Sequence, residues 1–274
     1  MFGKLLKHEF RATARIIPLG WLAMTIIAGL YILANKLEIE WLAGTSIVFV
    51  VLGIIAVSLL AVGVVAVRFY QTMYKNESYL SHTLPVKTSQ LLWSKALVGI
   101  VWIFSSSLLT IGGLLVLFSP LYDSNPELAM IIDMFFAWVK NVGVVPSICA
   151  LLGLLILGSM ESIAHIYTAI TLGNLPGNQK RSFMMSVIFY IIITQVIANV
   201  CGVLTLLLPP ALRFSETGLQ LVMSVPIRSM VDMSQATSGF FLDFGLAGFI
   251  VQYAVDIALL FMVKKMLDKK LSVR

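Results

Sequence analysis

Residues 45–67 read TSIVFVVLGIIAVSLLAVGVVAV, a stretch without a single charged side chain. A helix rises about 1.5 Å per residue, so these residues are enough to cross a hydrocarbon core of about 30 Å. In lipid every backbone N–H and C=O group needs a partner in the protein, and a helix supplies these partners within one segment. The stretch therefore predicts a membrane-spanning helix.

The rest of the chain repeats this pattern. Of its 274 residues, 59% are hydrophobic and 12% are charged, whereas about a quarter of a soluble domain is charged. A disordered chain is also excluded, because such chains combine low hydrophobicity with high charge. Six apolar runs are long enough to span: 16–34, 45–67, 96–118, 142–165, 183–208 and 244–263. We predict an all-α integral membrane protein with six spans, forming a single transmembrane domain over residues 1–274.

The distribution of charge predicts the orientation. Six spans place both termini on one side, which receives 15 Lys and Arg residues, while the other side receives Lys36, Lys140, Arg213 and Arg228. The positive-inside rule then places the termini and the 68–95 segment in the cytoplasm. We expect the acids of the opposite side to form a solvated outer surface: Glu38, Glu40, Asp123, Glu127, Asp133, Glu216, Asp232 and Asp243.

An amphipathic helix is predicted ahead of the first span, over residues 1–15. Its apolar stripe is Phe2, Leu5, Leu6 and Phe10, and its basic residues are Lys4, Lys7, Arg11 and Arg15. Such a helix lies on the inner leaflet, with its basic residues toward anionic lipid headgroups. It serves either as a topology anchor or as an elbow helix that also contacts a cytoplasmic partner.

The cytoplasmic segment 68–95 contains more apolar surface than a plain connection needs. Residues 68–86 read RFYQTMYKNESYLSHTLPV, which is compatible with a helix up to Pro85. Tyr, Met and Leu side chains can share one face of that helix, which suggests docking into the groove of a partner. The simpler interpretation is that the first aromatic residues pack at the membrane surface.

This stretch, placed between the second and third of six spans, resembles the membrane subunit of bacterial type-2 ABC exporters. More narrowly, it is similar to permeases of Firmicutes, in which Tyr-Leu-x-x-Thr-Leu-Pro recurs. The resemblance implies that 70–84 is a coupling helix in a cleft of a separate ATP-binding subunit, with Glu77 as its charged contact. The predicted contact residues are Tyr70, Met73, Tyr74, Glu77, Tyr79, Leu80 and Leu84.

The same resemblance implies the partners and the location. Two membrane subunits, identical or related, would form a pore over two ATPases in the bacterial cytoplasmic membrane, surrounded by lipid and without a nucleic-acid partner. ATP and Mg²⁺ would belong to the partner, since this chain lacks the Gly-x-x-x-x-Gly-Lys-Ser/Thr phosphate loop. We expect no catalytic residue, metal site or cofactor in the chain itself. The exported substrate would be a peptide, a lipid or a drug-like molecule.

Polar residues inside the last two spans suggest a second site. Asp256 lies about 12 Å into the bilayer by helical rise, where a bare carboxylate is costly. Gln252 is one turn away, and Gln195 and Asn199 have the same spacing in the fifth span. We expect these four residues to converge, as a structural cluster or as part of a substrate path. His165, near the end of the fourth span, is expected to form a local pair with the residue one turn before it, Glu161.

The long connection 209–243 opens with Pro209-Pro210 and holds an apolar part that is too short to span. It predicts a re-entrant or interfacial segment, or else a plain outer loop. Two other function classes compete with the exporter. One is an ion-coupled secondary transporter that uses Asp256. The other is an intramembrane enzyme, for which Glu161 to His165 lacks the first histidine of a zinc-protease motif.

Overall fold

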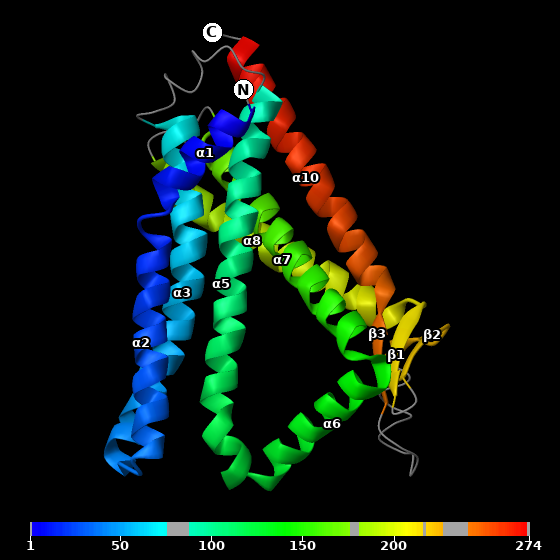
Figure 1. Cartoon of the computed structure of the whole chain (residues 1–274). Helices are drawn as coiled ribbons and strands as arrows, with labels where there is room; N and C mark the ends of the chain where they lie inside the picture. Colours follow the sequence, from blue (N-terminus) through cyan, green and yellow to red (C-terminus); the bar gives the residue numbers. More distant parts are fainter. Residues whose placement is uncertain (1, 76–87, 176–180, 216–217, 227–240, 273–274) are drawn as a thin grey trace. The chain divides into compact units, whose positions relative to one another are not determined.

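A computed structural model describes residues 2–75, 88–175, 181–215, 218–226 and 241–272 (Figure 1). Within these ranges, six helices contain a segment long and apolar enough to cross a membrane. They are α2 (Ile17–Lys36), α3 (Glu40–Tyr74), α5 (Thr88–Ser124), α7 (Val144–Gly173), α8 (Ser182–Leu207) and α10 (Leu246–Ser272). The six predicted spans and the all-α integral membrane fold are thereby confirmed.

Among the described residues, two further helices lie outside the spans. The first, α1 (Phe2–Thr13), occupies most of the predicted amphipathic segment, and α6 (Pro126–Val142) follows α5. Glu127 in the first turn of α6 and Lys140 in its last turn suit the partial charges of the helix ends. Gly143, with a φ of 99°, then separates α6 from α7 in a conformation that a side chain would disfavour.

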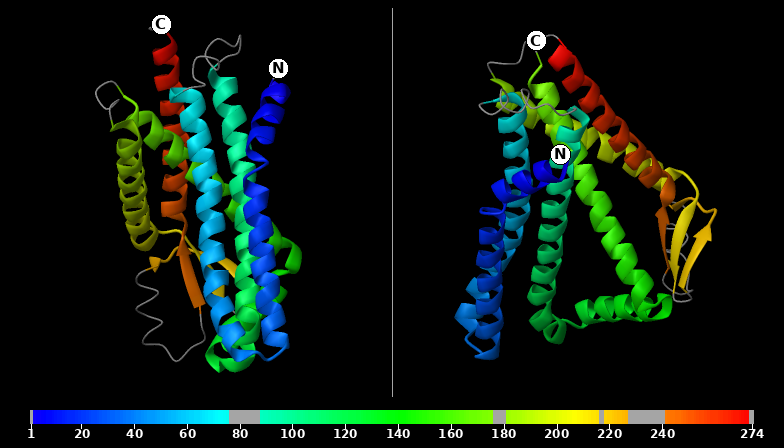
Figure 2. Two further views of the ribbon diagram at one scale, coloured as in Figure 1. Left: turned by 90° about the vertical axis from the view of Figure 1, so that its left-hand side faces the viewer. Right: turned by 45° about the horizontal axis from the view of Figure 1, so that its top comes forward.

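The chain divides into two compact units. The first unit comprises Met1–Ala129, Gly158–Ile163 and Lys264–Arg274. The second comprises Met130–Leu157 and Ala164–Val263. In the first unit, α2, α3 and α5 run side by side, as both views of Figure 2 show.

The helices of the first unit approach closely around Met24 of α2. A Cβ atom at Gly53 of α3 or at Gly113 of α5 would lie 2.6 Å from the thioether group of Met24. Small residues at such positions let membrane helices come into contact. The Tyr31 hydroxyl adds a hydrogen bond from α2 to the Leu117 carbonyl of α5, at 3.2 Å. Close packing and this buried hydrogen bond therefore both help to hold the three helices together.

Large apolar side chains cover the outer faces of the spans. Leu19 of α2, Leu59 of α3 and Phe183 of α8 are each about two-thirds exposed. In water, an apolar surface of this extent would be covered by a partner or would cause aggregation. In a bilayer it is the surface that lipid chains favour, so these exposed faces support a membrane location.

Helix α8 lies against both neighbouring helices of the second unit. A Cβ atom at Gly173, the last residue of α7, would overlap Ser186 in the second turn of α8. At the opposite end of α8, a Cβ atom at Gly248 of α10 would overlap Thr205. Glycine at both places allows the backbones to touch.

The connection 209–243, expected to be a re-entrant or interfacial segment or a plain outer loop, contains β-strands in its described part. Its described part contains three strands, β1 (Ala211–Ser215), β2 (Gly218–Val222) and β3 (Phe241–Gly245), which form an antiparallel sheet in the order β2-β1-β3. In β2, Gln220 alternates with Leu219 and Leu221, which is the two-residue period of a strand. An open sheet edge exposes N–H and C=O groups that lipid cannot satisfy, so this sheet does not lie in the hydrocarbon.

A partly buried ion pair joins two strands of this sheet. Arg213 of β1 stands opposite Asp243 of β3 and donates two hydrogen bonds of 2.8 Å to its carboxylate. The Ser224 hydroxyl donates a third hydrogen bond, at 2.7 Å. These hydrogen bonds with Asp243 raise the pKa of Arg213. The side chain of Asp243 is completely buried, so the prediction of a solvated outer acid is wrong for this residue.

Candidate functional site

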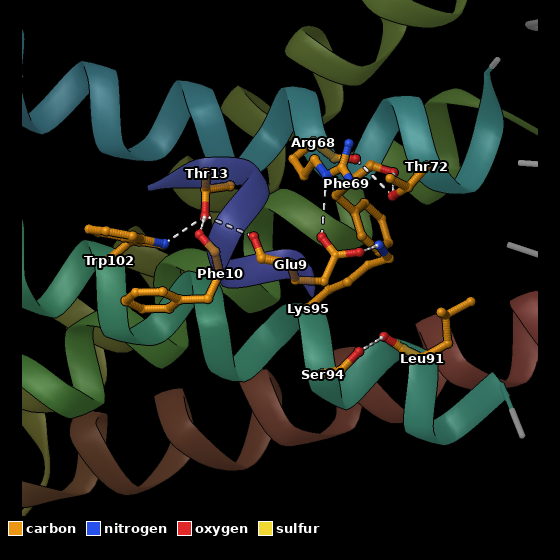
Figure 3. Close-up of polar contacts among 10 residues, drawn as sticks. All are labelled: Glu9, Phe10, Thr13, Arg68, Phe69, Thr72, Leu91, Ser94, Lys95 and Trp102. Atoms are coloured by element: carbon orange, nitrogen blue, oxygen red, sulfur yellow. Dashed lines mark hydrogen bonds and ion pairs between the residues drawn. The ribbon is translucent and has the colours of Figure 1, made fainter. Parts of the chain in front are cut away.

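A polar junction connects α1 with α3 and α5 (Figure 3). One carboxylate oxygen of Glu9 accepts a hydrogen bond from Lys95 Nζ of α5. The other oxygen accepts one from Arg68 Nε of α3, at 3.3 Å. We name these three residues the Glu9 junction.

The turn spacing of α1 explains why an acidic residue points inward. Glu9 follows Leu5 and Leu6 by one turn and therefore lies on the same stripe of the helix. Thr13 continues the stripe, and its hydroxyl donates to the Glu9 carbonyl at 3.0 Å. The same hydroxyl accepts a hydrogen bond of 2.7 Å from the indole of Trp102 in α5. The inner stripe thus begins apolar and ends in polar groups that find partners on α3 and α5.

Aromatic rings extend this contact into the helix bundle. Phe10 of α1 stacks on Trp102, with ring centroids 4.7 Å apart. Trp102 in turn lies 5.5 Å from the ring of Trp21 in α2. The indole of Trp21 donates to the Ser106 hydroxyl of α5 at 2.9 Å. Helix α1 is therefore packed against the bundle and is not held by its basic residues alone.

Burial makes the Glu9 junction energetically important. The side chains of Lys95, Glu9 and Arg68 are 4%, 10% and 19% exposed. Removing one partner from a buried ion pair leaves an uncompensated charge, at a typical cost of about 3–5 kcal/mol. We expect the lower end of this range here, because the partly exposed Arg68 is screened by solvent.

The junction coincides with the limits of the predicted cytoplasmic segment. Arg68 is the first residue of segment 68–95 and Lys95 is the last. The structure places them on two different helices and connects both to the same carboxylate. Glu9 therefore holds together the two ends of the segment to which we assigned the partner contact.

Only the first part of the predicted coupling helix is described. Tyr70, Met73 and Tyr74 belong to the end of α3, so no separate helix begins at residue 70. Met73 is fully buried, whereas Tyr70 and Tyr74 are partly exposed. Lys75 Nζ lies 5.6 Å from the centroid of the Tyr70 ring. The remaining predicted contacts lie outside the described residues: Glu77, Tyr79, Leu80 and Leu84.

The four polar residues predicted to converge do not form one cluster. Gln252 and Asp256 of α10 are buried, but Gln195 and Asn199 of α8 are exposed. The Asn199 amide donates to the Gln195 carbonyl of its own helix, at 2.7 Å. A shared spacing of one turn placed each pair on one face, but it did not determine which way that face points.

Asp256 instead contacts His165, for which the sequence predicted a different partner. His165 Nε2 of α7 lies 3.1 Å from Asp256 Oδ1. His165 Nδ1 lies 3.3 Å from the Thr194 hydroxyl of α8. The prediction paired His165 with Glu161 on its own helix. The sequence did contain a signal for the pairing of His165 with Asp256. Both are ionisable residues within spans, one basic and one acidic, and such residues tend to pair.

Neither a metal site in the described residues nor a match to a known protein gives further evidence about the function. In the described ranges, no group of three or more His, Cys, Asp and Glu residues is placed to hold a metal ion. Comparisons with protein families, with curated proteins and with solved structures give no match.

Proposed function

We propose that the chain is the membrane subunit of an ATP-driven exporter similar to the type-2 ABC exporters. A separate ATP-binding subunit would dock on residues 70–84, and a second membrane subunit would complete the pore. The observation that carries this proposal is the stretch 68–86, which connects the second and third of six spans. ATP and Mg²⁺ would be bound by the partner, and the exported molecule would be a peptide, a lipid or a drug-like compound.

The Glu9 junction supports the proposal on mechanical grounds. A push from a cytoplasmic ATPase acts on the connection between α3 and α5, and a loosely held connection would absorb it by deforming. The bonds from Glu9 to Arg68 and Lys95 tie the two helices together where they lead into that connection. The helices would then move together, with α1 as a brace.

Crosslinking tests the docking of the partner. A photoreactive amino acid is placed at Glu77 or at Tyr79, with Glu38 in the α2–α3 connection as the control position. The protein is co-expressed with candidate ATP-binding subunits encoded near its own gene. We expect crosslinks to such a subunit from 77 and 79, and none from 38. Equal crosslinking from all three positions would contradict the assignment.

Export itself supplies the second test. The double variant Glu77→Ala/Tyr79→Ala should insert normally, lose most co-purification with the ATP-binding subunit and lose ATP-dependent export. Unchanged export would refute the role of segment 70–84.

A second candidate function is an ion-coupled secondary transporter, favoured by the buried contact between His165 and Asp256. Transport by the purified chain in vesicles, driven by an ion gradient without any ATPase, would support this candidate over the exporter.

A further inference from the structure

Three helices of the second unit contribute to one buried polar contact. His165 comes from α7, Thr194 from α8 and Asp256 from α10. His165 is 2% exposed and Asp256 is 4% exposed. The His165 ring thus faces a carboxylate through Nε2, at 3.1 Å, and a hydroxyl through Nδ1, at 3.3 Å.

The polar atoms of this contact are incompletely satisfied. Nε2 of His165 is at ion-pair distance from Asp256, but the two groups lack the alignment of a hydrogen bond. Neither carboxylate oxygen of Asp256 has a hydrogen-bond partner among the described residues. The same holds for the hydroxyl of Thr168, which is fully buried and follows His165 by three residues on α7. Buried polar groups without partners are rare in native proteins, and such groups point to a ligand or a function.

The charge of the pair depends on how many protons it holds. With one proton, the pair is neutral overall, whether that proton sits on the His165 imidazole or on the Asp256 carboxyl group. With no proton it carries a bare carboxylate, and with two it carries a bare imidazolium. Asp256 lies eight residues before Lys264, about 12 Å along the helix, and a net charge at such a depth is strongly disfavoured.

We propose that His165 and Asp256 form a binding site for one proton within the membrane-spanning part of the chain. The proton is held between two helices, and Thr194 orients the imidazole through its second nitrogen. Gaining or losing a proton changes the net charge where α7, α8 and α10 meet, so the site couples proton binding to the packing of these helices. The proposal does not rest on coupling to an ATPase.

Neighbouring titratable groups leave this assignment intact. Glu161 precedes His165 by one turn on the same face of α7, so it is the acid that most needs a control. The other titratable residues of α7, α8 and α10 in the described ranges are Cys149, Tyr167, Tyr190, Cys201, Tyr253, Lys264, Lys265 and Asp268, together with Lys269 and Lys270 in the last turn of α10.

Nuclear magnetic resonance of the full chain in lipid nanodiscs tests the proposal. The chain has three histidines, so labelling with ¹⁵N-histidine gives three sets of ring signals. Two of these sets belong to His8 and His82 and serve as internal references. The third set, from His165, should keep one protonation form between about pH 5 and 8. Three sets that all titrate alike would overturn the proposal without any variant.

Variants then assign the effect to the pair. In a His8→Gln/His82→Gln background only His165 contributes signals. Asp256→Asn keeps the shape of the side chain but removes its charge, and it should shift the His165 ring signals and change their pH dependence. Glu161→Gln is the matched control and should leave both unchanged. Identical signals in Asp256→Asn, or native His165 signals that shift with Na⁺ at constant pH, would refute a proton site.

Discussion

Glu9 on α1 and Lys95 on α5 share a buried hydrogen-bonded ion pair, although the two residues are 86 positions apart in the sequence. Arg68 of α3 contacts the other oxygen of the same carboxylate. A single acidic side chain therefore connects the N-terminal helix to two spans. This arrangement gives a direct test of how much the N-terminal helix stabilises the bundle.

Glu9→Gln should destabilise the protein by about 3 kcal/mol, because it removes the charge that compensates Lys95 and Arg68. Thermal unfolding of the purified full chain in detergent measures this loss. Arg11→Gln is the control, since Arg11 is exposed on the same helix and should change stability by less than about 0.5 kcal/mol. Equal losses in the two variants would show that the Glu9 junction does not contribute specifically.

Arg213→Lys should make the three-stranded sheet sensitive to alkaline pH. The hydrogen bonds with Asp243 raise the pKa of Arg213 above its ordinary value. A raised pKa means that the contribution of this pair is complete below the ordinary value and is lost only as the pH rises through the raised one. The native pair is therefore unaffected up to about pH 11, whereas lysine, with an ordinary pKa of about 10.4, loses its charge earlier.

The unfolding temperatures of the native chain and of Arg213→Lys, measured at the same pH values, check this. Their difference should be small and constant near neutral pH, where it reflects the loss of the two-pronged guanidinium geometry. It should grow above about pH 10. A constant difference over the whole range would contradict the prediction.

Gly248→Ala should destabilise the contact between α10 and α8 by about 1–3 kcal/mol, because the added methyl group overlaps Thr205. The Thr205 hydroxyl donates to the Cys201 carbonyl at 2.8 Å, so it cannot move aside without losing that bond. Gly202→Ala is the matched control on α8, because a Cβ atom there meets nothing within 4 Å. It should be neutral or stabilise by up to about 1 kcal/mol. Thermal unfolding compares the two.

Cysteine labelling should confirm the predicted orientation. In a background without Cys149 and Cys201, single cysteines replace Lys7 or Lys36, both of which are exposed. A membrane-impermeant maleimide should label Lys36→Cys in intact cells and Lys7→Cys only after permeabilisation. The reverse pattern would place the termini outside.

The sequence predicted the spans well because hydropathy is a local property. It predicted helix ends poorly, since a helix continues past the lipid as long as no residue stops it. Residues 70–74 therefore extend α3, where the sequence suggested a new helix. The sheet was missed because five-residue strands give a weak periodic signal, and the apolar content of β2 suggested a membrane segment.

For the site residues, too, local features could be predicted from the sequence, whereas contacts between distant segments could not. The inward position of Glu9 was readable in principle, because the residue lies on the stripe of Leu5 and Leu6. Its partners on α3 and α5 were not, since tertiary contacts between distant segments leave no trace in a single sequence. His165 and Asp256 were each noticed as unusual within a span, but their pairing required knowledge of which helices meet.

The length of the two helices tied by Glu9 has a mechanical consequence. With 35 residues in α3 and 37 in α5, each is about 50–55 Å long, against a hydrocarbon thickness of about 30 Å. Both therefore project beyond the lipid as stiff rods. When such a long helix tilts about a point within the bilayer, its projecting end is displaced further than the part inside the membrane. Because Glu9 contacts both helices, it would make their projecting ends move together.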